Sequence, residues 1–155
     1  MLRRQRTDSF LTVLLWLLFF IAMTMKQADG ESICSQEIPK IVQKCIEEVH
    51  KMESFDCRLY TPTLADYQQK CPMSTLKCFE AEVYVLVLES GSKFLRKTQL
   101  TKRLNGLRSL IKQKDGANCP HCEVHREQAA IDFLTTFLEI LENINNQGCR
   151  EPASH

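Results

Sequence analysis

The sequence predicts an all-α fold: a disulfide-bonded four-helix bundle with up-up-down-down connectivity. Four stretches carry apolar residues at helical spacing, and the connections between them are long, short and long. A short connection makes two helices antiparallel neighbours, whereas a long one can cross the bundle from end to end. The chain also contains eight cysteines, all of them after an apolar leader. In an oxidising compartment such cysteines form a disulfide framework.

The first 30 residues have the pattern of a secretory signal peptide. Three arginines lie among the first six residues, residues 10–23 are apolar, and Ala28 and Gly30 are small residues at the cleavage position. The alternative is a signal anchor, but the apolar run is shorter than the roughly 18 residues of a spanning helix. We therefore expect cleavage and a secreted domain at residues 31–155. That domain has 16 basic and 17 acidic residues, so its net charge does not attract nucleic acid.

Residues 71–91 form the most apolar part of this domain, and they fit either a helix or a buried strand. Val83, Val85 and Val87 favour a strand. The helical interpretation depends on the spacing of four apolar residues, which are Leu76, Phe79, Val83 and Leu86. Pro72 suits a helix entry, Ser74 could cap it, and Gly91 suits its end. We expect a helix over Ser74–Glu89.

The other three helices are predicted by similar apolar stripes. The first is expected over Gln36–Ser54, the third over Lys97–Gln113 and the fourth over Arg126–Asn146, with Gly148 ending it. The first stripe consists of Ile38, Val42, Cys45, Val49 and Met52. The third consists of Leu100, Leu104, Leu107 and Ile111. The fourth consists of Ala130, Leu134, Phe137, Leu141 and Ile144, widened by Ile131 and Leu138.

Cys119 and Cys122 form a C-x-x-C motif that has three interpretations. They could be the redox pair of a secreted thiol-disulfide oxidoreductase, but that pair usually lies in a βαβ context, and helical patterns precede it here. With His121 and His125 they could hold zinc in an interaction domain, but a second ligand pair at the usual spacing is missing. We favour two structural half-cystines. No G-x-S-x-G motif or Gly-rich phosphate loop occurs, so the sequence does not indicate an enzyme, a cofactor or a metal.

Two charged faces have both an ordinary and a functional interpretation. Glu82, Val85 and Glu89 lie at i, i+3 and i+7, which predicts an acidic stripe away from the core. Around the third helix the basic residues are Lys93, Arg96, Lys97, Lys102, Arg103, Arg108, Lys112 and Lys114. Either face could be only solvated, and the basic one could also bind an acidic partner or a glycosaminoglycan. The stretch 97–113 lacks interleaved aromatic residues, which argues against single-stranded nucleic acid.

Several motifs together resemble the interleukin-15 family. They are Asp56-Cys57-Arg58-Leu59-Tyr60-Thr61, Lys77-Cys78-Phe79, Leu88-Glu89-Ser90-Gly91, Cys119-x-x-Cys122-Glu123, Phe133-Leu134 and Phe137. The resemblance covers most of residues 56–145, with a small insertion in the first long connection and a shorter second one. The first helix matches only by its apolar pattern. This resemblance implies a short-chain four-helix cytokine of the interleukin-2 subfamily.

The resemblance implies that the protein binds a sushi-domain alpha receptor and signals to lymphocytes through shared beta and gamma chains. It would act as a monomer or in a complex with the alpha receptor, which could present it on cells. The family residues that contact the alpha receptor fall on Tyr60, Glu82, Val85 and Glu89. Glutamates that meet basic residues of a partner steer association and fix its register. We expect Glu82→Lys and Glu89→Lys to abolish this binding without unfolding the protein.

Two positions depart from the family pattern. The aspartate that the family presents to the beta chain falls on Ile41 or Val42, and the glutamine presented to the gamma chain falls on Glu142. Binding to the alpha receptor is therefore better supported by the residues than engagement of the beta and gamma chains.

The resemblance also implies the disulfides Cys71–Cys119 and Cys78–Cys122. The bundle topology places the start of the first helix beside the end of the fourth, so a Cys34–Cys149 bridge is plausible. Cys45 and Cys57 remain. Cys45 lies on the apolar stripe and could be a buried free thiol, or it could pair with Cys57 if the first helix ends early.

Overall fold

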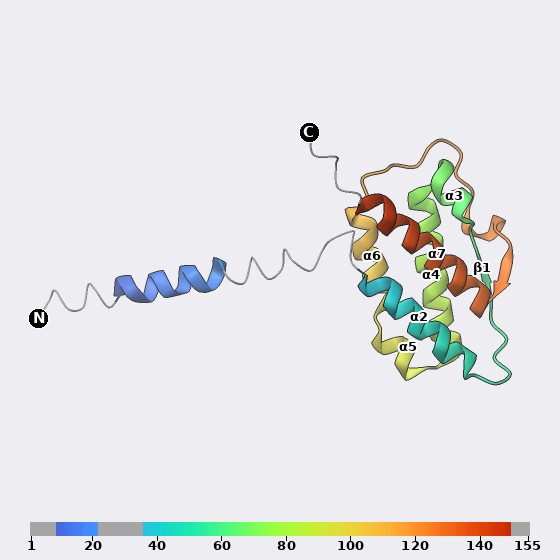
Figure 1. The fold of residues 1–155 in the computed structure, drawn as a ribbon, viewed down its shortest axis with the longest axis horizontal. Coiled ribbons are helices and arrows are strands. Elements are labelled where there is room, and N and C mark those ends of the chain that lie inside the picture. The colour runs from blue at the N-terminus through green and yellow to red at the C-terminus, as the bar shows by residue number, and fades with distance from the viewer. Residues whose placement is uncertain (1–8, 22–35, 150–155) are drawn as a thin grey trace, which may run out of the picture. The chain divides into compact units, whose positions relative to one another are not determined.

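The computed structural model describes residues 9–21 and 36–149 (Figure 1). Residues 9–21, within the expected leader, form a helix. Within these described ranges, no helix combines the length and the apolar character needed to cross a membrane. The expected cleavage position at Ala28–Gly30 lies outside the described residues, so cleavage stays a prediction.

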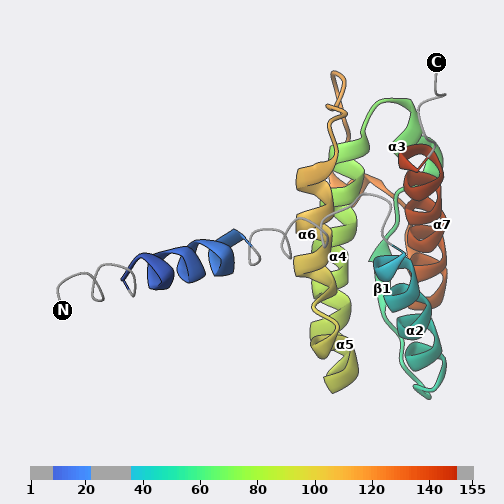
Figure 2. The ribbon, with the colours of Figure 1, turned by 60° about the vertical axis from the view of Figure 1, so that its left-hand side comes forward.

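Residues 36–149 fold as the predicted four-helix bundle. Its long helices are α2 (Glu37–His50), α4 (Pro72–Ser90), α6 (Leu100–Leu110) and α7 (Ala130–Gly148). In Figure 2, α2 and α4 run downward whereas α6 and α7 run upward. Helix α2 packs along α7, and α4 packs along α6. This arrangement confirms the up-up-down-down topology.

The central apolar stretch is the helix α4, and the strand alternative is wrong. All four residues of its predicted stripe, from Leu76 to Leu86, are buried. The ring of Phe79 lies 5.2 Å from that of Phe133 and 5.0 Å from that of Phe137, between centroids. Gly91 ends the helix at a φ of 60°, a left-handed conformation that glycine adopts without strain. Tertiary packing of one face therefore outweighs the strand preference of the valines.

Several helix boundaries differ from the prediction, including the end of the third helix, which lies at Leu110 and not at Gln113. Helix α2 ends at His50, four residues before Ser54, which has a left-handed φ of 60°. The third helix is broken: α5 (Lys93–Lys97) is separated from α6 at Gln99, which has a φ of 52°. The fourth helix begins only at Ala130, because the residues before it form a strand. The apolar stripes predicted the helices, but not where the backbone leaves the helical conformation.

The two long connections pair with each other through a small sheet that the sequence did not predict. Strand β1 (Arg58–Tyr60) lies antiparallel to β2 (Glu127–Ala129), with Tyr60 opposite Glu127. The Thr61 amide extends the ladder by donating to the Arg126 carbonyl at 2.9 Å. The same connections contain α3 (Leu64–Gln69) and the 3₁₀ helix η1 (Cys122–Val124). This pairing fixes the first connection against the second.

Two disulfides join α4 to the connection between α6 and α7. Cys71 is bonded to Cys119, and Cys78 to Cys122, with Cα–Cα distances of 5.7 and 5.1 Å. These are the pairs that the family resemblance implies. Cys149 is disulfide-bonded. Its expected partner, Cys34, lies outside the described residues, so the Cys34–Cys149 pairing stays a prediction.

Asp115, from the same connection, caps the N-terminus of α4. Its carboxylate accepts from the amide of Met73 at 2.8 Å and from the amide of Ser74 at 3.0 Å. The Ser74 hydroxyl also bonds to this carboxylate. Ser74 is therefore not the cap itself but lies inside the first turn. A carboxylate at this position satisfies helix amides that would lack partners and complements the helix dipole.

Candidate functional site

Strand β1 lies beside α4, and a hydrogen bond between the two elements links two of the predicted binding residues. The Tyr60 amide donates to Glu82 Oε2 at 2.7 Å. Glu82 is only 9% exposed. The expectation that Glu82 lies on an outward stripe is therefore wrong. The first long connection folds back over this part of α4, and the carboxylate satisfies a strand amide there.

The other predicted residues of this face are more accessible. Tyr60 and Val85 are half-buried, and Val85 packs against the core. Glu89 is exposed near the end of α4. The spacing of i, i+3 and i+7 places Glu82, Val85 and Glu89 along one side of the helix. The structure thus brings Tyr60 to the Glu82 end of this row.

Three further carboxylates lie near Glu82 and act on it electrostatically. Burial raises the pKa of the Glu82 carboxyl, and the hydrogen bond from Tyr60 opposes that shift. The charges of Glu123, Glu127 and Glu89 raise the pKa further. We call Glu82, Glu89, Glu123 and Glu127 the acidic cluster. It draws its members from α4, η1 and β2.

Sequence reasoning did not include Glu123 and Glu127 in the site, although both are exposed. Glu127 lies opposite Tyr60 only once β1 and β2 are paired, and three-residue strands carry almost no periodic signal. Glu123 directly follows Cys122, so the bridge from Cys122 to Cys78 of α4 was the available clue. A known disulfide therefore indicates which acidic residues come near α4.

The two cysteines that are free among the described residues do not form a reactive site. Cys45 and Cys57 are buried and not bonded to each other, so the predicted alternative of a free Cys45 holds. Burial, with the nearby charge of Glu48, raises the pKa of Cys45 to about 11. Burial and a hydrogen bond with Glu89 raise the pKa of Cys57 to about 12. Both therefore stay thiols near neutral pH, and a thiol is a poor nucleophile.

The C-x-x-C motif forms neither a redox pair nor a zinc site. Cys119 is bonded to Cys71, directly before α4, and Cys122 to Cys78 within α4, so no disulfide joins Cys119 to Cys122. As half-cystines they offer no thiolate to a metal. In the part of the chain that the structure describes, no group of three His, Cys, Asp or Glu side chains could hold a metal ion. Their role is the structural one.

Comparison with known proteins decides the family. The family model for interleukin 15 matches residues 13–146. The chain belongs to the interleukin-15 family. It is 28% identical to interleukin-15 of Felis catus over 109 residues, which are 69% of this chain and 64% of that protein. With interleukin-15 of Homo sapiens it shares 30% over 105 residues, 66% of this chain and 64% of that protein.

A more distant relative is interleukin-15 of Mus musculus, at 25% identity over 107 residues, which are 68% of this chain and 62% of the relative. The matches span just under two thirds of the length of these relatives. The bundle of α2, α4, α6 and α7 agrees with the four-helix fold of the interleukin-15 family. Interleukins are signalling proteins and not enzymes, so the oxidoreductase and zinc alternatives are not favoured.

For an interleukin-15 family member, the positions expected to meet the beta and gamma chains differ in accessibility. Val42 is fully buried at 0% exposed, so it cannot contact a partner. Ile41 is half-buried and lines a groove between α2 and α5. Glu142 is exposed on α7. Of the two positions expected for the beta chain, only Ile41 is therefore accessible.

Proposed function

We propose that the protein is a secreted cytokine that binds a sushi-domain alpha receptor through Tyr60, Val85 and the acidic cluster. It then signals to lymphocytes through shared beta and gamma receptor chains. The proposal includes removal of residues 1–30 as a signal peptide. Two observations support it: membership of the interleukin-15 family and the group of carboxylates around the paired strands. The disulfides fit an oxidising compartment.

The hydrogen bond from Tyr60 to Glu82 is the observation that carries this proposal. It holds β1 against α4 before any partner binds, and β1 in turn holds β2 with Glu127. A binding surface that is already ordered loses less conformational entropy on association. At 9% exposed, Glu82 offers little surface of its own. We therefore assign it a positioning role, whereas Glu89, Glu123 and Glu127 present charge to a basic receptor.

Charge reversal at Glu89 tests the proposal, because Glu89 is the exposed family position on α4. We expect Glu89→Lys to weaken binding to the immobilised sushi ectodomain of the alpha receptor by at least about tenfold, roughly 1.4 kcal/mol. The measurement is the dissociation constant at physiological salt. Circular dichroism checks that the helical content is unchanged.

Glu142→Lys is the matched control for this experiment. Glu142 is exposed on α7, twelve residues after its first residue Ala130, or about 18 Å along the helix. This variant carries the same change of charge and should bind the alpha receptor within about threefold of wild type. If Glu89→Lys also stays within threefold, α4 does not provide the alpha-receptor contact. If both variants weaken binding equally, net charge and not a defined face explains the association.

The engagement of beta and gamma chains is proposed from the family resemblance alone. Glu142 is the residue that we propose for gamma-chain contact, and Ile41 is the accessible position for the beta chain. Binding of their ectodomains to the complex with the alpha receptor can be measured in the same assay.

A further inference from the structure

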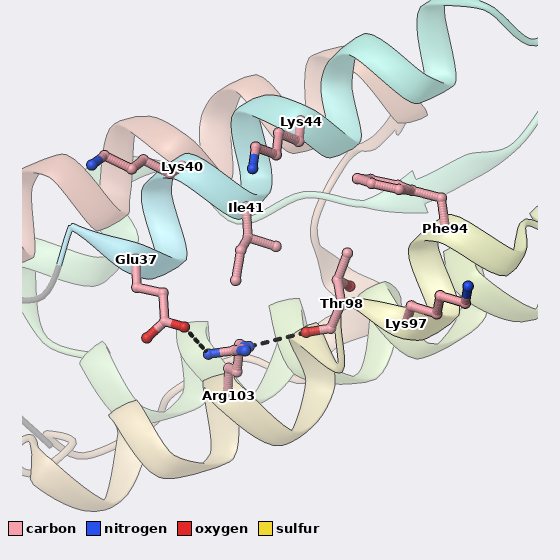
Figure 3. Close-up of a pocket in the computed structure, with 8 residues that line it drawn as sticks. All are labelled: Glu37, Lys40, Ile41, Lys44, Phe94, Lys97, Thr98 and Arg103. Carbon is pink, nitrogen blue, oxygen red and sulfur yellow. Dashed lines mark hydrogen bonds and ion pairs between the residues drawn. The ribbon is translucent and has the colours of Figure 1, made fainter. Parts of the chain in front are cut away.

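A basic groove lies between α2 and the α5–α6 segment, on elements that the acidic cluster does not use (Figure 3). Its volume is about 460 Å³, within the range of roughly 300–1,000 Å³ typical of ligand sites. Ile41 points from α2 into the gap on the side of Thr98, and Phe94 of α5 lies farther along the groove. The positive charges around it come from Lys40, Lys44, Lys97 and Arg103.

Most of the positive charge in the groove is not neutralised by the protein. Arg103 binds Glu37 at 2.6 Å and donates to the Thr98 carbonyl at 3.0 Å, which fixes the guanidinium at one end. Lys40, Lys44 and Lys97 are exposed, and no ion pair joins them to a carboxylate among the described residues. The groove lining therefore has a formal charge of +3 from four cations and Glu37.

The groove belongs to a wider segregation of charge along the chain. Residues 91–114 contain eight basic residues and no acidic one, although the whole chain has 20 basic and 19 acidic residues. Arg108, farther along α6, is paired with Glu80 of α4 at 3.2 Å. A segment with basic but no acidic residues, in a protein that is nearly neutral overall, raises the local concentration of polyanions.

We propose that the basic groove binds a chain of sulfated glycosaminoglycan. Sulfate groups carry a permanent negative charge that matches the three unpaired lysines, and hydrogen bonds between ionised groups are stronger than neutral ones. The Phe94 ring, 37% exposed, and Ile41 offer an apolar surface for the carbon face of a sugar ring. The proposal rests on the secretion in the proposed function, and it shares Ile41 with the proposed beta-chain contact but no residue with the alpha-receptor contacts.

The shape of the groove favours a polysaccharide over an acidic protein surface. A stable protein partner usually covers about 800 Å² on each side with a dry apolar centre. Here the apolar surface is narrow, and flexible lysines from α2 and α5 surround it. Lysine ammoniums are strongly hydrated point charges, which suit a mobile polyanion better than a fixed carboxylate geometry.

A charge-removal variant tests this site, with heparin octasaccharide as the probe. We expect Lys40→Gln/Lys44→Gln/Lys97→Gln to weaken heparin binding by about tenfold, because each exposed ion pair contributes a fraction of a kcal/mol. The slope of log affinity against log salt should also become shallower, since fewer counterions are released on binding. The matched control is Lys102→Gln/Lys112→Gln/Lys114→Gln, which removes three exposed lysines elsewhere in the basic segment. It should lower the affinity for heparin by less than about threefold.

Three outcomes would overturn the proposal. They are an equal loss of affinity in both triple variants, equal binding of N- and O-desulfated heparin, and tighter binding of a poly-glutamate peptide, which would indicate an acidic protein partner. Binding of the alpha-receptor ectodomain to the groove variant separates this test from the proposed function. It should be unchanged, and Glu89→Lys should still bind heparin.

Discussion

Glu82→Leu is expected to lower the free energy of unfolding by about 1–3 kcal/mol. Leucine fills a similar volume but has no acceptor, so the Tyr60 amide would lose its partner at 2.7 Å. A buried donor without a partner costs its full desolvation free energy. The measurement is chemical denaturation at neutral pH. Because Glu82 is buried, Glu82→Lys is also expected to destabilise the fold, whereas the sequence alone predicted a change in binding without unfolding.

Glu82→Gln is the matched control, because its amide oxygen can still accept from Tyr60. It should stay within about 1 kcal/mol of wild type at neutral pH. A loss as large as that of the leucine variant would contradict the assignment of this hydrogen bond. A leucine variant as stable as wild type would contradict it as well.

The glutamine variant should also show a different pH dependence. Since burial raises the pKa of Glu82 in the folded protein, the folded state takes up this proton at a higher pH than the unfolded chain. The resulting stabilisation is complete below the ordinary glutamate pKa of about 4.3 and is lost as pH rises through the raised value. Wild type should therefore gain stability relative to Glu82→Gln as pH falls from neutral.

Removal of both disulfides of α4 is expected to cost about 6–7 kcal/mol and to leave the protein largely unfolded. The bridges close loops with sequence separations of 48 and 44 residues. Closing the first such loop contributes about 4 kcal/mol. With one bridge in place, the other closes a loop on the order of ten residues, which contributes about 2–3 kcal/mol. Removal of either disulfide alone should therefore lower the free energy of unfolding by only about 2–3 kcal/mol.

The variants Cys71→Ala/Cys119→Ala and Cys78→Ala/Cys122→Ala, alone and combined, measure this non-additivity by chemical denaturation. Two single-pair losses of about 4 kcal/mol each would show that the bridges stabilise independently. A loss below about 1 kcal/mol for the combined variant would contradict their structural role.

The helices were predictable because the apolar residues that they bury recur at helical spacing in the sequence. The stripe from Leu76 to Leu86 identified α4, and its buried face against Phe133 and Phe137 shows why the valines beside it do not form a strand. The break at Gln99 was not predictable from periodicity, since Leu95 and Leu100 are both buried on either side of it. Helix α3 did carry a local signal. Thr63 and Asp66 form a capping box, and their spacing of three residues is visible in the sequence.

The candidate site was only partly predictable, because its geometry depends on contacts between distant residues. Tyr60 and Glu82 are 22 residues apart, and nothing in the local sequence indicates that the amide of Tyr60 donates a hydrogen bond to the carboxylate of Glu82. Family resemblance named both residues but could not give their exposure. The partnership of Glu127 with Tyr60 likewise requires the paired strands. Sequence thus located the α4 residues and missed those from the second connection.

Hydrogen–deuterium exchange with and without the alpha-receptor sushi domain tests most directly where the partner binds. On complex formation, we expect slower exchange in β1, in β2 with η1, and in the half of α4 that contains Glu82 and Glu89. Exchange in α2, α5 and α6 should not change at short labelling times. Protection confined to α2 with α5–α6, or to α7, would contradict an alpha-receptor site at the acidic cluster.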